Sequence, residues 1–280
     1  MTARPRAHDN RAVPDDAATF LAPAELYDAH VGRYGAGLAA GLIAAAGVPA
    51  EGRVLDVGCG PGALTRVLAA RLGPERVAAA EPSEPFANAC AERIPGADVR
   101  VASAEDLPFA DGTFDAVVSQ LVVNFIPDQE RAVAEMARVA GPGGLVAASV
   151  WDYAGGMTLL RAFWDAALVV DPEGATPLDE GTRFPVCSEA GLRALWAGAG
   201  LREIRTGALT ASASYDSLAD LWRPLERGVG PSGAYAASLP ADRRAALRDE
   251  LGRRLGAGAA PFTLDARAWW VAGRTAPAGG

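Results

Sequence analysis

The chain has 280 residues, of which 50% are hydrophobic and 21% are charged. This composition can bury a full core, so we expect one large folded domain, or one domain plus a cap, rather than a disordered chain. Acidic residues outnumber basic ones by 34 to 26, and the formal net charge is −8. That balance argues against a nucleic-acid partner and against an anionic membrane surface.

Every basic residue is an arginine, so the chain has no lysine for Schiff-base chemistry. Together with the high Ala, Gly and Pro content, this favours GC-rich coding, as in an actinobacterium. The three cysteines and two histidines form neither a disulfide framework nor a metal-binding knuckle, so we expect no metal. The first twenty residues lack the apolar core of a signal peptide, and no apolar run is long enough to span a membrane. We therefore expect a cytoplasmic protein.

The chain divides into four predicted parts. Residues 1–20 are polar and interrupted by prolines, which predicts a flexible tail. Residues 21–50 predict an N-terminal helical lid. Residues 51–213 and 257–280 predict an α/β core, and residues 214–256 a helical cap inserted near the C-terminus.

Short apolar runs alternate with helical patterns through the first half of this core. Strands are predicted at residues 53–58, 76–81, 98–102, 114–119 and 144–151, with helices at 63–72, 84–93 and 128–139. This alternation predicts an α/β fold with a doubly wound, mostly parallel, Rossmann-like sheet. The carboxyl ends of its parallel strands would then meet at one edge, where ligands bind.

The most informative stretch is the sequence VLDVGCGPGALT, which begins at Val54. An apolar strand delivers Asp56 to a turn made by three glycines, Gly58, Gly60 and Gly62. Glycine lets backbone amides lie against a nucleotide-like ligand. The same spacing, with Glu81 as a ribose-binding acid, also fits the dinucleotide fingerprint, so an NAD(P)-dependent oxidoreductase is an alternative at this point.

Three more motifs follow in chain order: SAEDLPF at 103–109, DGTFDAVVS at 111–119 and GPGG at 141–144. With the glycine turn, they resemble the class I S-adenosylmethionine (SAM)-dependent methyltransferases, particularly those of ubiquinone and menaquinone biosynthesis. The later part of the chain is similar to actinobacterial methyltransferases of undefined substrate. The resemblance implies the class I methyltransferase fold, SAM as cofactor and S-adenosyl-L-homocysteine (SAH) as product.

Carried over residue by residue, the resemblance implies that Asp56 holds the turn and the amino group of SAM. It implies that Glu81 accepts both ribose hydroxyls and that Arg33 pairs with the SAM carboxylate. Relatives often carry Asp at the position of Ser103, so the adenine contact is expected to be weaker here. The implied cofactor-binding residues are Tyr27, Arg33, Asp56, Gly58, Cys59, Gly60, Gly62, Glu81, Pro82, Ser83, Phe86, Ser103, Ala104, Glu105, Gln120 and Leu121.

Residues beyond the fourth and fifth predicted strands, with tryptophans from later helices, are predicted to line the acceptor pocket. These residues are Asn124, Trp151, Tyr153, Trp164 and Trp222. The catalytic residue is left open among four candidates: Asp152, His30, Asn124 and Tyr153. Asp152 is the best carboxylate candidate for a base, and His30 is either a base or a structural residue of the lid. Because a sulfonium is a strong electrophile, positioning alone can drive the transfer.

We therefore expect a SAM-dependent methyltransferase that acts on a small-molecule acceptor in specialised metabolism. A non-methylating protein that uses SAM structurally or for rearrangement chemistry is one alternative. The NAD(P)-dependent oxidoreductase is the other, although the motifs after the third predicted strand argue against it. The sequence leaves open the acceptor, the methylated atom and the oligomeric state.

Overall fold

The computed structural model describes residues 24–279. The predicted flexible tail, residues 1–20, lies outside this range, as do residues 21–23 of the predicted lid. The strands are β1 (Val54–Val57), β2 (Val77–Glu81), β3 (Asp98–Val101), β4 (Phe114–Gln120), β5 (Ala140–Trp151), β6 (Arg202–Tyr215) and β7 (Phe262–Arg274). Within the described range they form one seven-stranded sheet in the order β3-β2-β1-β4-β5-β7-β6.

Strands β1 to β5 are parallel, and β7 pairs antiparallel with both β5 and β6. The switch point of the sheet lies between β1 and β4, since the chain moves outward from β1 to β3 and then returns to β4. In such sheets a ligand binds beyond the carboxyl ends of the strands at the switch point. The predicted fold class, a mostly parallel Rossmann-like sheet, is confirmed.

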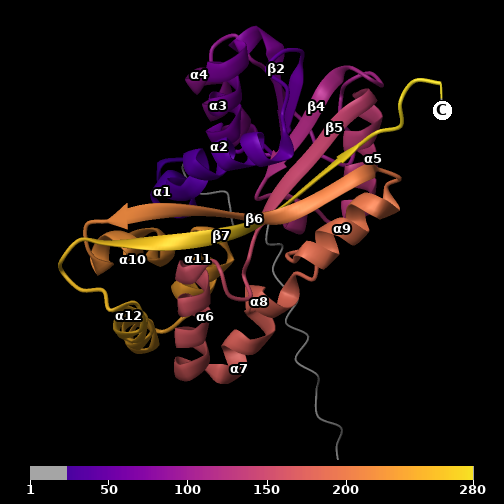
Figure 1. Cartoon of the computed structure of the whole chain (residues 1–280). Helices are drawn as coiled ribbons and strands as arrows, with labels where there is room; N and C mark the ends of the chain where they lie inside the picture. Colours follow the sequence, from indigo (N-terminus) through magenta and orange to yellow (C-terminus); the bar gives the residue numbers. More distant parts are fainter. Residues whose placement is uncertain (1–23, 280) are drawn as a thin grey trace, which may run out of the picture.

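Helices cover both faces of this sheet (Figure 1). Before β5 they are α1 (Ala24–Ala29), η2 (Val31–Tyr34), α2 (Gly35–Ala46), α3 (Ala63–Leu72), η3 (Pro74–Arg76), α4 (Glu84–Arg93), η4 (Val123–Phe125) and α5 (Gln129–Val139). After β5 they are α6 (Thr158–Val170), α7 (Pro172–Ala175), η5 (Thr176–Leu178), α8 (Glu180–Arg183), α9 (Glu189–Gly198), α10 (Leu218–Glu226), α11 (Gly230–Ser238) and α12 (Ala241–Leu255).

The alternation of side chains along each strand separates two hydrophobic clusters. On one face, Val54 of β1 packs with α2 and α3, whose buried side chains include Leu42 and Leu68. On the other face, Leu55 packs in the cluster that contains Met136 of α5. Strand β1 is buried along its whole length because helices cover both faces, which explains its continuous apolar sequence.

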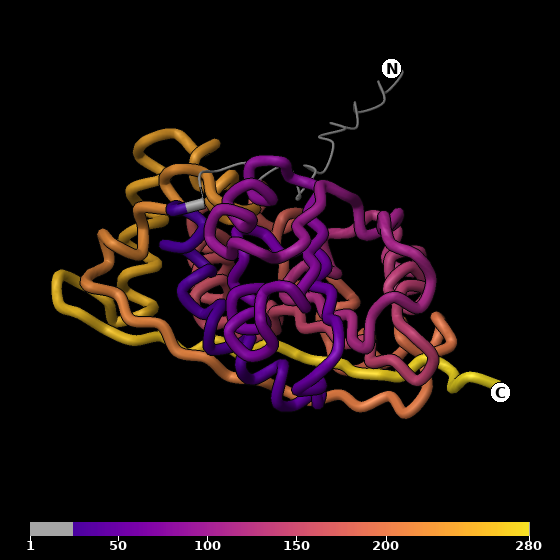
Figure 2. The backbone as a smooth tube through the Cα atoms, turned by 90° about the horizontal axis from the view of Figure 1, so that it is seen from above, coloured from indigo at the N-terminus to yellow at the C-terminus, as the bar shows by residue number. Residues whose placement is uncertain are grey.

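The helices of residues 218–255 lie between β6 and β7 in the chain, and α6 packs against both α11 and α12. Figure 1 shows these helices together on one side of the long β6–β7 ribbon. Seen from above in Figure 2, the indigo N-terminal helices lie between this orange and yellow region and the magenta half of the sheet. Contacts of α1 with α10 and of α2 with β6 join the first helices to the later part of the chain.

The observed elements begin and end close to the predicted positions as far as β5. The short elements of residues 172–183 were not predicted, because this polar, proline-containing stretch has no apolar periodicity. The bounds of the lid, core and cap stay predictions. In the described part of the chain, no helix is long and apolar enough to cross a membrane.

Candidate functional site

The turn after β1 holds its shape through close backbone packing. The amides of Gly58 and Cys59 both donate to the carbonyl oxygen of Ala80, at 2.8 and 3.2 Å, which fastens the turn to β2. Gly58 has φ +72°, and a Cβ there would lie 2.5 Å from a methyl carbon of Val122. Gly60 has φ +52°, but a Cβ there would meet no described atom within 4 Å. Sterics therefore require glycine at Gly58, whereas Gly60 leaves open space.

Glu81 closes this turn from the carboxyl end of β2. Its Oε2 accepts a hydrogen bond from the amide of Gly60 at 2.9 Å, and its Oε1 accepts one from the amide of Ser83 at 3.0 Å. Burial raises the pKa of Glu81, and these two hydrogen bonds oppose that rise. Because each carboxylate oxygen has a second acceptor position, Glu81 can still bind two further donors.

Asp56 is buried at the other side of the turn. Burial is the largest cause that raises the pKa of Asp56, from 3.8 to about 7, with Glu81 adding to it and the Thr65 hydrogen bond opposing it. The hydroxyl of Thr65 donates to Oδ2 at 2.6 Å, while Oδ1 has no partner among the described residues. The unfolded carboxyl loses its proton near pH 3.8 and the folded one near 7. This group therefore lowers the stability of the fold as pH rises between those values.

These residues border a cavity of about 420 Å³ beyond the carboxyl ends of β1, β2 and β4. Fourteen of the sixteen residues predicted to bind the cofactor line it. They are Tyr27, Asp56, Gly58, Cys59, Gly60, Glu81, Pro82, Ser83, Phe86, Ser103, Ala104, Glu105, Gln120 and Leu121. Among the described residues that line the cavity, three side chains are acidic and none is basic. The cavity therefore suits a ligand that carries positive charge.

The loop after β3 is held against the start of α5. Ser103 Oγ accepts from the amide of Glu105 at 3.2 Å, and Glu105 Oε1 accepts from the amide of Asp128 at 2.8 Å. The side chain of Arg131 donates to the carbonyl oxygen of Glu105 at 2.7 Å. The loop is thus fixed in place where it borders the cavity, and contact of these residues with an adenine stays a prediction.

Two aromatic rings and an amide complete the walls of the cavity. The rings of Tyr27 and Phe86 have centroids 5.8 Å apart. Burial raises the pKa of Tyr27 to about 12, and the nearby Glu81 and Asp28 carboxylates add to the rise. The side-chain nitrogen of Gln120 donates to the carbonyl oxygen of Gly35 at 3.1 Å. The Oε1 atom of Gln120 takes no part in this hydrogen bond.

Three buried oxygen atoms of the wall lack a hydrogen-bond partner within residues 24–279: Asp56 Oδ1, Ser83 Oγ and Gln120 Oε1. All three can accept a hydrogen bond. Since a buried polar group without a partner costs free energy, these atoms indicate a ligand that supplies donors. The ammonium and hydroxyl groups of SAM are such donors, so the residues present fit this cofactor.

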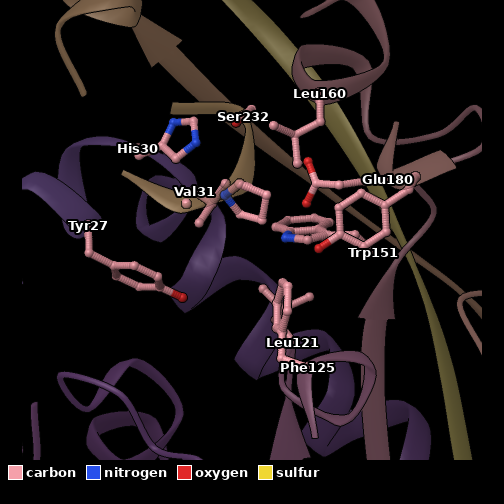
Figure 3. A pocket seen from close by; sticks show the side chains of 12 residues that line it. Tyr27, His30, Val31, Leu121, Phe125, Trp151, Leu160, Glu180 and Ser232 are labelled. Carbon is pink, nitrogen blue, oxygen red and sulfur yellow. The ribbon is translucent and has the colours of Figure 1, made fainter. Parts of the chain in front are cut away.

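A second, much smaller cavity of about 20 Å³ lies next to the first (Figure 3). The two share the residues Tyr27, Leu121 and Phe125. We call the smaller one the inner chamber, and its remaining lining residues are His30, Val31, Trp151, Tyr153, Leu160, Glu180, Gly230, Pro231 and Ser232. It has room for about one water-sized group.

Of the predicted acceptor-pocket residues, Trp151 and Tyr153 line the inner chamber. Burial raises the pKa of Tyr153 well above its usual value. Asn124 is buried beside Tyr153, and its side chain opposes part of this rise in the Tyr153 pKa. Trp164 lies behind Glu180, to which its indole N–H donates at 2.9 Å. The predicted candidate His30 also lines the chamber.

Two predicted charged residues lie outside the two cavities. Arg33 does not line the cavity, because its guanidinium donates to Asp220 and to the carbonyl oxygen of Ser214, both at 2.8 Å. It joins η2 to the β6–α10 region. Asp152 is paired with Arg267 of β7, whose Nε donates to Oδ2 at 2.7 Å. This pair holds the Asp152 carboxylate outside both cavities.

Two further predicted residues are placed elsewhere. Gly62 has φ +97° and faces α4, since a Cβ there would lie 2.7 Å from Ile94, so its role is to let α3 and α4 approach. Trp222 borders a separate groove between α10 and α12, together with Arg244 and Arg248. The sequence did not predict this location, because Trp222 lies far along the chain from the motifs that line the cavity.

Sequence reasoning missed Glu180 and Ser232, which line the inner chamber from α8 and α11. Neither lies in a motif, and only the folded chain brings them beside Tyr27. Leu121, which was predicted, follows β4 and has φ +63°. Such strain in a residue other than glycine is typical of functional sites, and Leu121 borders both cavities.

The sheet and its cavity define an α/β protein with a ligand site at the switch point. Residues 55–148, about a third of the chain, match the family described as a methyltransferase domain. An uncharacterized methyltransferase of Mycobacterium sp. (strain KMS) is 36% identical over 175 residues, which cover 59% of this chain and 65% of that protein. Tocopherol O-methyltransferase of Arabidopsis thaliana is 38% identical over 104 residues, covering 35% of this chain and 30% of that protein.

Among solved structures, phosphoethanolamine N-methyltransferase 2 of Haemonchus contortus, in complex with SAM, has a TM-score of 0.58. It is 15% identical, and the match covers 95% of this chain and 61% of that one, so the likeness shows the fold. The alignments with curated relatives span 30% to 65% of their lengths. Residues 55–148 therefore match a methyltransferase domain, and the described chain has a fold similar to that of the solved methyltransferase.

Proposed function

We propose that this chain transfers a methyl group from SAM to a small-molecule acceptor. The observation that carries the proposal is the cavity beyond β1, β2 and β4, which fourteen of the residues expected to hold SAM line together. The tocopherol methyltransferase, which shares the methyltransferase region, has a small molecule in its name. A role in specialised metabolism belongs to the same proposal.

The charge of the cavity favours SAM over a dinucleotide. Asp56, Glu81 and Glu105 line it, and none of the described lining residues is basic. A ligand with a sulfonium and an ammonium group is attracted to such a site, whereas the diphosphate of NAD(P) is repelled. The acidic wall therefore supports SAM against the oxidoreductase alternative.

SAM supplies a methyl group on a positively charged sulfur atom. The role of the protein is to bind both reactants, align them and keep water out. Such alignment can lower the activation barrier of the transfer by about 7–11 kcal/mol. Asp56, Glu81 and Gln120 offer acceptors to the cofactor, while Tyr27 and Phe125 separate its cavity from the inner chamber. This division supports an acceptor on the chamber side.

The test is isothermal titration of the purified chain with SAH after unfolding and refolding, which removes any ligand carried through purification. We expect micromolar binding, followed by transfer of labelled methyl from SAM to small molecules in an extract. Refolded protein with native circular dichroism that binds NADH but not SAH would overturn the proposal. Tight SAH binding without turnover on any acceptor would instead favour the non-methylating alternative.

A further inference from the structure

Arg33 connects the N-terminal helices to the later part of the chain. Its Nε donates to the carbonyl oxygen of Ala29 at 2.7 Å, its Nη1 to that of Ser214 at 2.8 Å, and its Nη2 to Asp220 Oδ1 at 2.8 Å. The guanidinium carbon also lies 4.7 Å from the centre of the Tyr215 ring. Each nitrogen atom of the guanidinium therefore has an acceptor, and these acceptors come from α1, β6 and α10.

Asp220 is held in position for this contact. It lies in the first turn of α10, where the hydroxyl oxygen of Ser217 accepts its amide at 3.3 Å, and its Oδ2 accepts the amide of Asp216 at 3.3 Å. Burial acts to raise the pKa of Asp220, but the hydrogen bonds of Arg33 and Asp216 outweigh it, so the pKa lies below its usual value. The side chains of Arg33 and Asp220 are 22% and 15% exposed. A charge-assisted pair so far removed from water is stronger than an exposed ion pair.

A second contact of η2 lies beside this pair. Tyr34 follows Arg33 and is fully buried, and its hydroxyl shares a hydrogen bond of 3.2 Å with that of Tyr215. The ring of Tyr34 also meets that of Trp151 edge-on, with centroids 5.6 Å apart. The end of η2 is therefore fixed against both β5 and β6.

The other end of the same segment borders the cofactor cavity. Tyr27 of α1 lines this cavity, with its ring centroid 5.8 Å from that of Phe86. Arg33 is not among the described residues that line either cavity, but it fixes the backbone between itself and Tyr27. The amide of His30 donates to the carbonyl oxygen of Tyr27 at 3.0 Å, and Arg33 holds the carbonyl oxygen of Ala29 between them. The position of Tyr27 therefore depends on the contacts of Arg33.

Two contacts nearer the cofactor cavity also hold residues 24–35, and both are weaker. Asp28 pairs with Arg93 at 2.9 Å, but these side chains are 44% and 37% exposed. Gln120 donates to the carbonyl oxygen of Gly35 at 3.1 Å, without a charge on either side. Exposed ion pairs contribute little, and neutral hydrogen bonds are weaker than charge-assisted ones. The segment therefore depends mainly on its contacts with β6 and α10.

Resting on the proposed function, we infer that Arg33 is a positioning residue that holds Tyr27 against the bound cofactor by bonding to β6 and α10. Release of the cofactor moves Tyr27 aside, and this requires the contacts of Arg33 to loosen. Figure 2 shows the indigo N-terminal helices beside the orange part of the chain, in agreement with the contacts of α1 with α10 and of η2 with β6. Both β6 and α10 lie outside the matched methyltransferase region. The later part of the chain therefore contributes to cofactor retention without lining the cofactor cavity.

The test measures SAH binding to the full chain, with affinity from isothermal titration and dissociation rate from surface plasmon resonance. We expect Arg33→Gln to bind SAH about tenfold more weakly, mainly because SAH dissociates faster. Asp220→Asn removes the charged partner but keeps Arg33, and we expect an increase in the dissociation rate of about threefold. If Arg33→Gln does not fold, Asp220→Asn provides the same decision.

Arg193→Gln is the matched control. Arg193 is exposed and joins α9 to β6, since its guanidinium donates to the carbonyl oxygen of Ile204 at 3.0 Å and to Thr206 Oγ1 at 2.7 Å. The same substitution there removes a comparable link between a helix and β6, away from Tyr27. Its SAH affinity and dissociation rate should equal those of wild type.

Tyr27→Ala distinguishes positioning from a general loss of stability. If Arg33 acts through Tyr27, adding Arg33→Gln to Tyr27→Ala should change the SAH dissociation rate by less than about twofold. A tenfold effect that persists in the Tyr27→Ala background would overturn the inference. Wild-type dissociation rates in Arg33→Gln and Asp220→Asn, with only the stability in urea reduced, would show a merely structural role and overturn it as well. Failure of the wild-type chain to bind SAH would overturn the proposed function itself.

Discussion

Replacing Glu81 with alanine tests the geometry of the cofactor cavity most directly. The two oxygens of Glu81 accept the amides of Gly60 and Ser83, so the carboxylate both shapes the turn and faces the cavity. Alanine removes both hydrogen bonds and the acceptors offered to the ribose hydroxyls. We therefore expect weaker cofactor binding with little change in the fold.

The magnitude follows from the bonds that are lost. A charged acceptor contributes about 1–3 kcal/mol to a bound ligand, which corresponds to about a 5- to 150-fold rise in Kd. The cost in stability is smaller, about 1 kcal/mol, because Gly60 and Ser83 border the cavity and water can reach their amides. Burial raises the pKa of Glu81, so the charged carboxylate is itself unfavourable in the folded state. Its removal therefore offsets part of the loss in stability.

Isothermal titration with SAH measures the affinity, and urea unfolding of the ligand-free protein measures the stability. Glu92→Ala is the matched control, because Glu92 is exposed near the end of α4 and does not line the cavity. Equal SAH affinity of Glu81→Ala and wild type would remove Glu81 from the site and refute the assignment of this cavity to the ribose.

Three other substitutions separate binding from stability. Urea unfolding should show that wild-type protein is less stable at pH 8 than at pH 5, because the Asp56 pKa lies at about 7. In Asp56→Asn this difference in stability should be largely lost, and an unchanged difference would show that another group causes it. Gly60→Ala and Gly143→Ala should each lower the free energy of unfolding by about 1 kcal/mol, because both glycines have positive φ. Only Gly60→Ala should weaken SAH binding, and equal SAH affinities of the two variants would argue against SAH binding beside Gly60. Arg267→Ala should cost about 1–3 kcal/mol by leaving buried Asp152 unpaired, with SAH affinity unchanged, and a loss of SAH affinity would argue against a purely structural pair.

The cofactor side of the site could be predicted because its residues follow parallel strands in continuous motifs. Asp56 and Glu81 end neighbouring strands, and the rules of parallel sheets bring such positions together. The contact of Arg33 with Asp220 could not be predicted, because Asp220 is 187 residues further along the chain. No local pattern reports a contact of that kind.

The same limit explains Asp152 and Glu180. Asp152 follows β5 as a base would, but its partner Arg267 comes from β7, 115 residues later, and the antiparallel pairing of β7 with β5 places it there. Glu180 lies in a stretch whose short helices have no periodic signal. Asp152 and Glu180 therefore differ in their surroundings because of tertiary contacts that the sequence does not reveal.

The two cavities are built from different parts of the chain, and this has a consequence for how specificity can change. Apart from Tyr27, the described walls of the cofactor cavity come from residues 56–127, all within the matched methyltransferase region. Glu180 and Ser232 come from α8 and α11, outside that region. Substitutions in these helices leave the hydrogen bonds of the turn after β1 intact, so they can test the inner chamber separately from the cofactor cavity.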